Sequence, residues 1–201
     1  MDSNRSKQYP LRRREVVESL LRQRGDLLVV AGLGASAWDI TAAGDDALNF
    51  PLWGAMGGAV SLGLGLALAQ AERRVLVVTG DGEMLMGLGS LATVAIKSPP
   101  NLAIVVLDNE RYGETGMQTT HTAGNTDLAA VALATGIPVC ANVSDQSTFE
   151  SVHTQIRNEK GPFFFNIKIR AEDLPLVLPP KDGVVLKQRF RRALLGADTG
   201  A

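Results

Sequence analysis

Short apolar runs alternate with longer amphipathic stretches along most of this chain. The apolar runs are typical of buried strands and cover residues 27–31, 75–78, 102–107 and 163–169, with a shorter one near Val139. Stretches typical of helices cover residues 11–24, 54–71, 84–97, 127–135, 146–158 and 184–195. Strands that alternate with helices predict a single-domain α/β fold with a mostly parallel sheet covered by helices on both faces.

The same pattern suggests how the chain is divided. We expect residues 1–9 to be a flexible N-terminus and residues 10–170 to form one domain. Residues 171–201 should be a C-terminal extension with a basic amphipathic helix. We interpret that helix as an element that packs on the domain or contacts another subunit.

One apolar stretch has two interpretations. Residues 54–71 carry no charge and are nearly as long as a membrane span. The stretch is rich in glycine, however, and Glu72, Arg73 and Arg74 follow it directly. We therefore favour a buried helix that packs closely against another backbone.

Composition and charge argue against several classes of function. The formal net charge of −1 gives no electrostatic reason to bind nucleic acid or an anionic membrane. Cys140 is the only cysteine, so it cannot form an internal disulfide, and this fits a reducing compartment. The start of the chain shows no secretion signal, and we expect a cytoplasmic protein.

Ligands of open parallel sheets bind at the carboxyl ends of the strands, and three loops are predicted there. They cover residues 32–36, 80–82 and 108–122. The first loop resembles a dinucleotide fingerprint, which also requires an acidic residue at the end of the next strand. Asp45 lies in a turn instead. We interpret this loop as one that faces a phosphate, with Ser36 as a hydroxyl donor.

The second loop, Gly80-Asp81-Gly82, places a carboxylate beside a predicted anion site. Such a carboxylate would be repelled unless a cation lay between the two. Mg²⁺ fits, because it combines one or two protein oxygen ligands with phosphate oxygens. Asn109 follows the next strand and could supply a neutral oxygen. Each residue alone could be a turn former, but together they predict a magnesium diphosphate site.

These motifs resemble those of the thiamine diphosphate-dependent enzymes, in which GDG is followed by a helix, a strand and Asn. Residues 53–57, WGAMG, match the G-x-M-G element of the decarboxylase and acetolactate-synthase branch, and residues 107–113, LDNERYG, match its N-N-x-x-Y-G. Four segments are similar to the diphosphate-binding half of sulfopyruvate and phosphonopyruvate decarboxylases: MGGAVSLGLGLAL, GDGEMLMGLGSLAT, PPNLAIVVLDN and ETGMQTTHT. The resemblance covers roughly residues 10–170.

The resemblance implies a cofactor role for each matching residue. Asp81, the side chain of Asn109 and the main-chain oxygen of Arg111 would bind Mg²⁺. The sequence departs from the family pattern at Glu83, where Ser is common, and at Asp108, which replaces the first Asn. Other contacts with thiamine diphosphate would come from Gly34, Ala35, Ser36, Gly54, Met56, Gly80, Gly82, Glu83, Tyr112 and Gly113.

Four residues are candidates for a part in the chemistry. By resemblance, Met56 would force the cofactor into a bent conformation, and the carbonyl of Gly54 would accept a hydrogen bond from its 4′-amino group. Glu114 and His121 lie in the loop that should face the substrate. A solvated loop position is the alternative for His121.

The implied function is that of the diphosphate-binding subunit of a 2-oxo acid decarboxylase of the sulfopyruvate or phosphonopyruvate type. In this family a glutamate on a separate pyrimidine-binding domain activates the cofactor, and nothing in residues 10–170 is left to form that domain. We therefore expect a second chain to supply it, in a heterotetramer or larger assembly that acts on a small 2-oxo acid. The alternatives are an acetolactate-synthase-like carboligase subunit and a non-catalytic cofactor-binding subunit.

Overall fold

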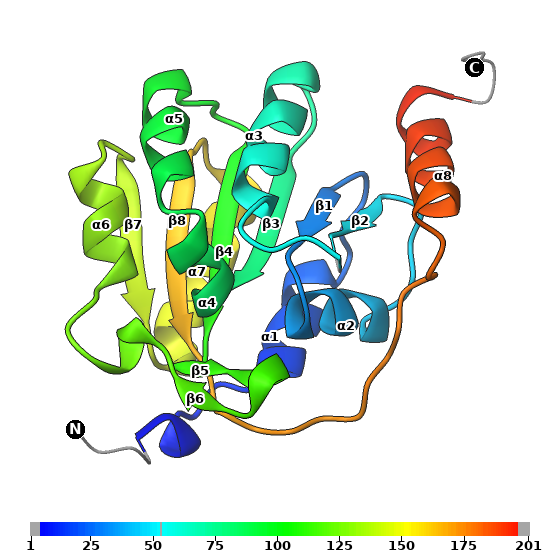
Figure 1. Cartoon of the computed structure of the whole chain (residues 1–201). Helices are drawn as coiled ribbons and strands as arrows, with labels where there is room; N and C mark the ends of the chain where they lie inside the picture. The colour runs from blue at the N-terminus through cyan, green and yellow to red at the C-terminus, as the bar shows by residue number, and fades with distance from the viewer. Residues whose placement is uncertain (1–4, 53, 197–201) are drawn as a thin grey trace.

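The computed structural model describes residues 5–52 and 54–196, and Figure 1 shows how they are arranged. In this part of the chain one sheet has the strand order β2-β1-β3-β4-β8-β7. Every neighbouring pair in it is parallel, which confirms the predicted fold class. The strands are β1 (Leu28–Ala31), β2 (Asn49–Pro51), β3 (Val75–Gly80), β4 (Leu102–Asp108), β7 (Val139–Val143) and β8 (Phe163–Lys168).

Helices cover both faces of the sheet (Figure 1). One face packs against α1 (Arg13–Leu21), α2 (Ala35–Ala42) and α7 (Gln146–Asn158). The other packs against α3 (Ala59–Ala69), α4 (Asp81–Met86), α5 (Gly89–Lys97), α6 (Leu128–Ala134) and α8 (Gly183–Leu195). Since β1, β3 and β4 are buried on both faces, their sequences are continuous apolar runs.

The glycine-rich helix is shorter than predicted. The prediction of a helix over residues 54–71 was wrong at its start, because α3 begins at Ala59. Gly57 has a φ of 84°, a left-handed conformation that cannot continue a right-handed helix. Within α3, a Cβ on Gly63 would overlap Cγ2 of Val77 on β3. The helix therefore packs closely on the sheet, but against the side chain of Val77 and not, as the favoured interpretation expected, against another backbone.

The predicted helix over residues 84–97 is two helices. The first, α4, begins at Asp81, and α5 begins at Gly89. Between them Gly87 approaches the main chain so closely that a Cβ on it would lie 2.6 Å from the carbonyl oxygen of Gly57. The break therefore results from a contact between two loops, which the apolar pattern does not reveal.

Two further differences concern short elements. The edge strand β2 was not predicted, because it has only three residues and ends in proline. The polar loop after β4 contains a two-stranded antiparallel hairpin, β5 (Arg111–Tyr112) and β6 (Gln118–Thr119). Single-turn 3-10 helices lie beside it at Gly113–Thr115 and His121–Ala123.

Both ends of the described chain pack on the domain. Residues Arg5–Gln8 form a 3-10 helix beside the hairpin, while α8 lies at the β2 edge of the sheet (Figure 1). Phe190 of α8 packs edge-on against Phe50 of β2, with ring centroids 5.2 Å apart. In the described residues no helix has the length and apolar character of a transmembrane span.

Candidate cofactor site

The predicted loops meet where the sheet changes direction. From β1 the chain continues to β2 on one side, and from β3 it continues to β4 on the other, so the switch point lies between β1 and β3. The loop after β1 leads into α2, and Gly80 at the end of β3 leads into α4. Open α/β sheets bind ligands in the crevice at such a point.

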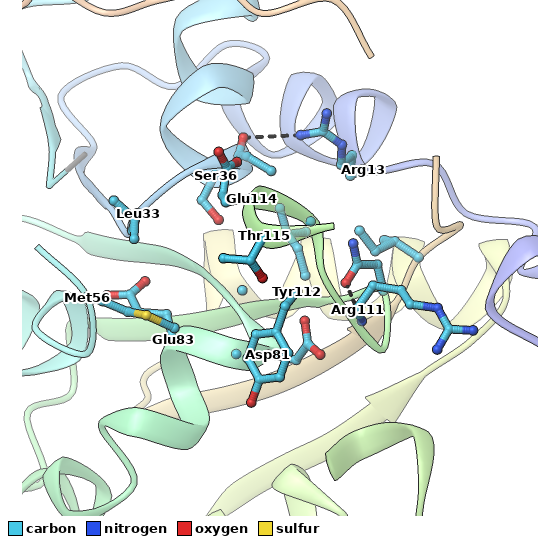
Figure 2. A pocket seen from close by; sticks show the side chains of 17 residues that line it. Arg13, Leu33, Ser36, Met56, Asp81, Glu83, Arg111, Tyr112, Glu114 and Thr115 are labelled. Atoms are coloured by element: carbon cyan, nitrogen blue, oxygen red, sulfur yellow. Dashed lines mark hydrogen bonds between the residues drawn. The ribbon is translucent and has the colours of Figure 1, made fainter. Parts of the chain in front are cut away.

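A cavity at the switch point brings most of the predicted site residues together. Figure 2 shows this cavity from close by, with side chains from the loops after β1, β3 and β4 around it. The predicted residues that line it are Ala35, Ser36, Met56, Gly80, Asp81, Gly82, Glu83, Asn109, Arg111, Tyr112, Gly113 and Glu114. Leu33 and Thr115, from two of the predicted loops, also line it, and the lining residues outside those loops that were not predicted are Arg13, Leu107 and Ile169.

Asp81 has a buried carboxylate next to a second one. Its residue is only 2% exposed, and Oδ2 accepts hydrogen bonds from the hydroxyls of Thr120 at 2.5 Å and Thr122 at 3.2 Å. Burial, followed by repulsion from Asp108, raises the pKa of Asp81 to about 7. A divalent cation beside Asp81 would stabilise the charged form that burial disfavours.

Sheet register explains why Asp81 and Asn109 share the cavity. Gly80, at the end of β3, pairs with Leu107, near the end of β4. Asp81 and Asn109 therefore follow two adjacent strands at the same end of the sheet. The side-chain oxygen of Asn109 accepts a hydrogen bond from the Arg111 amide at 2.9 Å, which closes a tight turn directly after β4. The structure therefore fixes the orientation of the Asn109 side chain locally.

Two glycines of the site are approached by side chains of the same loop. A Cβ on Gly82 would lie 2.6 Å from Cε1 of Tyr112, and a Cβ on Gly34 would lie 2.6 Å from the Glu114 carboxylate. Gly34 also has a φ of 73°. Glycine is therefore needed at both positions, because side chains of the loop after β4 pack against the main chain there. The fit to the predicted cofactor comes from Asp81 and Asn109, which line the cavity and carry the kind of oxygen ligands through which Mg²⁺ joins a protein to phosphates.

The side chain of Glu83 has a structural role that the sequence did not predict. The resemblance assigned only its amide to the cofactor. Its carboxylate is 4% exposed and accepts hydrogen bonds from the Thr79 hydroxyl and, at 3.2 Å, from the Ala59 amide at the start of α3. It also fills the space beside Gly32, where a Cβ would overlap it. Glu83 thus links the loop after β1, the end of β3 and the start of α3.

Buried ion pairs link α1 to α2. Nη1 of Arg13 lies 2.8 Å from Oδ2 of Asp39, and Nε of Arg14 lies 3.1 Å from the other carboxylate oxygen. Asp39 is fully buried. Two consecutive arginines on an otherwise apolar helix face were the available signal, but their partner on α2 could not be identified from spacing.

The four candidates for a part in the chemistry lie in different places. Met56 lines the cavity and is 40% exposed, so it faces open space beside Gly82. Gly54 lines a neighbouring hollow with residues of β2 and α8. His121 is exposed and is not among the described residues that line the cavity. Glu114 lies on the Gly34 side, where its Oε1 accepts a hydrogen bond from Nε1 of Trp38 at 3.3 Å.

This fold and site define a class of α/β domains that hold a phosphorylated cofactor at the carboxyl ends of parallel strands. The chain belongs to the thiamine pyrophosphate enzymes: the family model described as "Thiamine pyrophosphate enzyme, C-terminal TPP binding domain" matches residues 33–167. It therefore carries a thiamine diphosphate-binding domain.

Two named relatives are similar to this chain over most of its length. The chain is 38% identical over 187 residues to the sulfopyruvate decarboxylase subunit beta of Methanothermobacter thermautotrophicus, which covers 93% of this chain and 97% of that protein. It is also 38% identical over 170 residues to the phosphonopyruvate decarboxylase of Streptomyces viridochromogenes, covering 83% of this chain but 42% of that protein.

A solved structure agrees on the fold. A putative thiamin diphosphate-dependent enzyme from Mycobacterium smegmatis matches 81% of this chain and 32% of its own, with a TM-score of 0.69 and 22% identity. At that identity the likeness supports the fold alone.

Proposed function

We propose that this chain is the diphosphate- and Mg²⁺-binding subunit of a two-subunit, thiamine diphosphate-dependent 2-oxo acid decarboxylase. The observation that carries the proposal is the cavity at the switch point, which Asp81 and Asn109 line together. The expected substrates are sulfopyruvate or phosphonopyruvate, which the names of the relatives suggest, and the product would be an aldehyde.

In this proposal Mg²⁺ is bound by the Asp81 carboxylate, the Asn109 side-chain oxygen and the main-chain oxygen of Arg111. A divalent cation would stabilise the buried Asp81 carboxylate, whose charged form is disfavoured first by burial. The amides of Gly82 and Glu83, together with the 34–36 loop, would bind the diphosphate. Gly80, Tyr112 and Gly113 would complete the surroundings of the cofactor.

When bound, thiamine diphosphate supplies the nucleophile and the electron sink for the decarboxylation of a 2-oxo acid. The chain would position that group and exclude water from it. Met56 would support the cofactor from below, and the Gly54 carbonyl would accept a hydrogen bond from its amino group. Glu114 and His121 remain candidates for substrate contacts.

A separate pyrimidine-binding subunit would supply the activating glutamate. The support is a comparison of lengths: this chain covers 97% of a subunit named beta, yet 42% of a phosphonopyruvate decarboxylase. The share of that enzyme outside the match would correspond to the second half of the site. We expect a heterotetramer or larger assembly, with the active site between unlike chains.

Reconstitution tests the proposal. The chain is purified alone and with its partner subunit, and both samples receive thiamine diphosphate, Mg²⁺ and a panel of 2-oxo acids. We expect release of CO₂ and an aldehyde from the pair only. Full turnover by the isolated chain would contradict the two-subunit assignment, and condensation of two 2-oxo acids into an acetohydroxy acid would indicate the carboligase instead.

A further inference from the structure

Glu110 lies between two of the proposed Mg²⁺ ligands but does not line the cavity. It is flanked by Asn109 and Arg111, and it is 2% exposed. Its φ of 60° places a non-glycine residue in the left-handed region, which is unfavourable unless the surroundings hold it there. The contacts of its side chain should therefore show what holds this turn.

Three donors from distant parts of the chain converge on the Glu110 carboxylate. Oε1 accepts hydrogen bonds from Nη2 of Arg5 at 2.5 Å, the hydroxyl of Tyr9 at 2.8 Å and Nζ of Lys168 at 3.0 Å. The N-terminal segment and the end of β8 thus hold the Glu110 carboxylate in place.

The N-terminal segment is itself fixed to the body of the domain. The amide of Ala171 donates to the carbonyl of Ser6 at 2.9 Å, and Nε of Arg170 donates to the carbonyl of Tyr9 at 3.0 Å. The N-terminal segment that reaches Glu110 is therefore attached to the residues directly after β8. Lys168 also contacts Oδ2 of Asp108 at 2.7 Å, directly before the turn.

The backbone of Glu110 connects the turn to Asp81. Its carbonyl accepts a hydrogen bond from the amide of Thr120 at 3.0 Å, and the hydroxyl of that threonine donates to Asp81 at 2.5 Å. A displacement of Glu110 would thus disturb the turn between Asn109 and Arg111 and the threonine that contacts Asp81.

We propose that Arg5, Tyr9 and Lys168 are positioning residues for Mg²⁺, which act through Glu110. They hold the left-handed turn that presents the Asn109 side chain and the Arg111 carbonyl to the metal. This inference rests on the proposed function, because it assigns these residues to its metal site. It gives the N-terminal segment a role in cofactor binding rather than in folding alone.

The test measures Mg²⁺ affinity, not turnover. The full chain, assembled with its partner, is saturated with thiamine diphosphate and titrated with Mg²⁺ by calorimetry. Loss of a residue that orients a metal ligand typically weakens metal affinity about 10-fold to 100-fold. We expect about a 10-fold loss for Arg5→Ala, recovery for Arg5→Lys, and no further loss when Arg5→Ala is added to Glu110→Gln.

A matched control is available on the same surface. Arg12 lies 2.6 Å from Glu172 in a more exposed ion pair, and Arg12 is not among the side chains that donate to Glu110. Arg12→Ala should leave the Mg²⁺ affinity unchanged. An unchanged affinity in Arg5→Ala, or an equal loss in Arg12→Ala, would overturn the inference while leaving the proposed function intact. A wild-type complex without Mg²⁺-dependent cofactor binding would overturn both.

Discussion

Glu83 lines the cavity, and its side chain is buried. The carboxylate receives hydrogen bonds from Thr79 and Ala59, which lie at the ends of two different elements. Burial raises the pKa of this carboxyl group, and the hydrogen bonds oppose that effect. The position therefore stabilises the loops that form the cavity.

Replacing Glu83 with alanine should destabilise the folded chain. The substitution leaves the Ala59 amide without its acceptor, and we expect a loss of about 1–3 kcal/mol in the free energy of unfolding. Urea denaturation measures this directly. Glu150→Ala, on the exposed side of α7, serves as the control and should change little. Equal stabilities of Glu83→Ala and the control would contradict this role.

At the residue scale the sequence predicted which polar residues line the cavity better than it predicted the side chains that hold the loops in place. Asp81 and Asn109 could be recognised because their position directly after apolar strands limits where they can lie. The partners of Glu83 and Glu110 come from segments that only the tertiary fold brings together. Spacing along the chain carries no information about such contacts.

At the element scale, the packing of α3 on β3 leads to a prediction with an internal control. A Cβ on Gly63 would overlap Val77, whereas nothing lies within 4 Å of a Cβ on Gly65 in the same helix. Gly63→Ala should therefore destabilise the chain by about 1–3 kcal/mol. Gly65→Ala should stabilise it by about 0.5–1 kcal/mol, since alanine favours helix.

Thermal and urea unfolding of the two variants distinguish close packing from a general effect of glycine. Opposite signs are expected from the contact with β3. Two variants that are both more stable than the wild type would show that α3 does not need this close approach.

Helix α7 should make stability depend on pH. Nε of Arg157 donates a hydrogen bond to Nε2 of His153 at 2.8 Å, which requires a neutral ring. Burial, followed by the charge of Arg157, lowers the pKa of His153 below its usual value of about 6.5. The contribution of the neutral ring is therefore present above about pH 6.5 and is lost as the pH falls through the lowered pKa.

His153→Gln keeps a side-chain acceptor but does not titrate. We expect the free energy of unfolding of the variant to fall less than that of the wild type between about pH 7 and pH 5. Denaturant titrations at several pH values provide the measurement. Parallel pH profiles would show that His153 does not contribute.

Element boundaries could be predicted where a local signal marks them. Helix α7 spans residues 146–158 as expected, and the Asp145 carboxylate caps it by accepting from the Thr148 amide at 2.9 Å. The predictions for residues 54–71 and 84–97 were wrong for one shared reason. Gly57 and Gly87 meet in space, and each belongs to a helix boundary that the apolar pattern alone does not define.

At the scale of the whole molecule, the alternation of strands and helices indicated the parallel sheet but not the complete strand order. The GDG-to-Asn spacing predicted that β3 and β4 are neighbours, and this was confirmed. The position of β8 between β4 and β7 had no signal in the sequence, since both strands read as short apolar runs. Tertiary packing decides which of them is the edge strand.

The two ends of the described chain make contacts that only the complete tertiary fold brings about. Arg5 reaches Glu110, and Arg189 of α8 forms an ion pair with Asp45 at 2.5 Å. Both contacts span more than a hundred residues of sequence. The division into 1–9, 10–170 and 171–201 remains a prediction, because these contacts do not test whether the segments fold separately.

The central claim is that Asp81 binds thiamine diphosphate through Mg²⁺. The most direct measurement titrates thiamine diphosphate into the assembled complex, with and without Mg²⁺, for the wild type and for Asp81→Ala. Asp182→Ala, at the remote start of α8, serves as the control. We predict that the wild type and the control bind the cofactor tightly only with Mg²⁺. Asp81→Ala should bind it weakly whether or not Mg²⁺ is present. Mg²⁺-dependent binding by Asp81→Ala with the wild-type affinity would contradict the account.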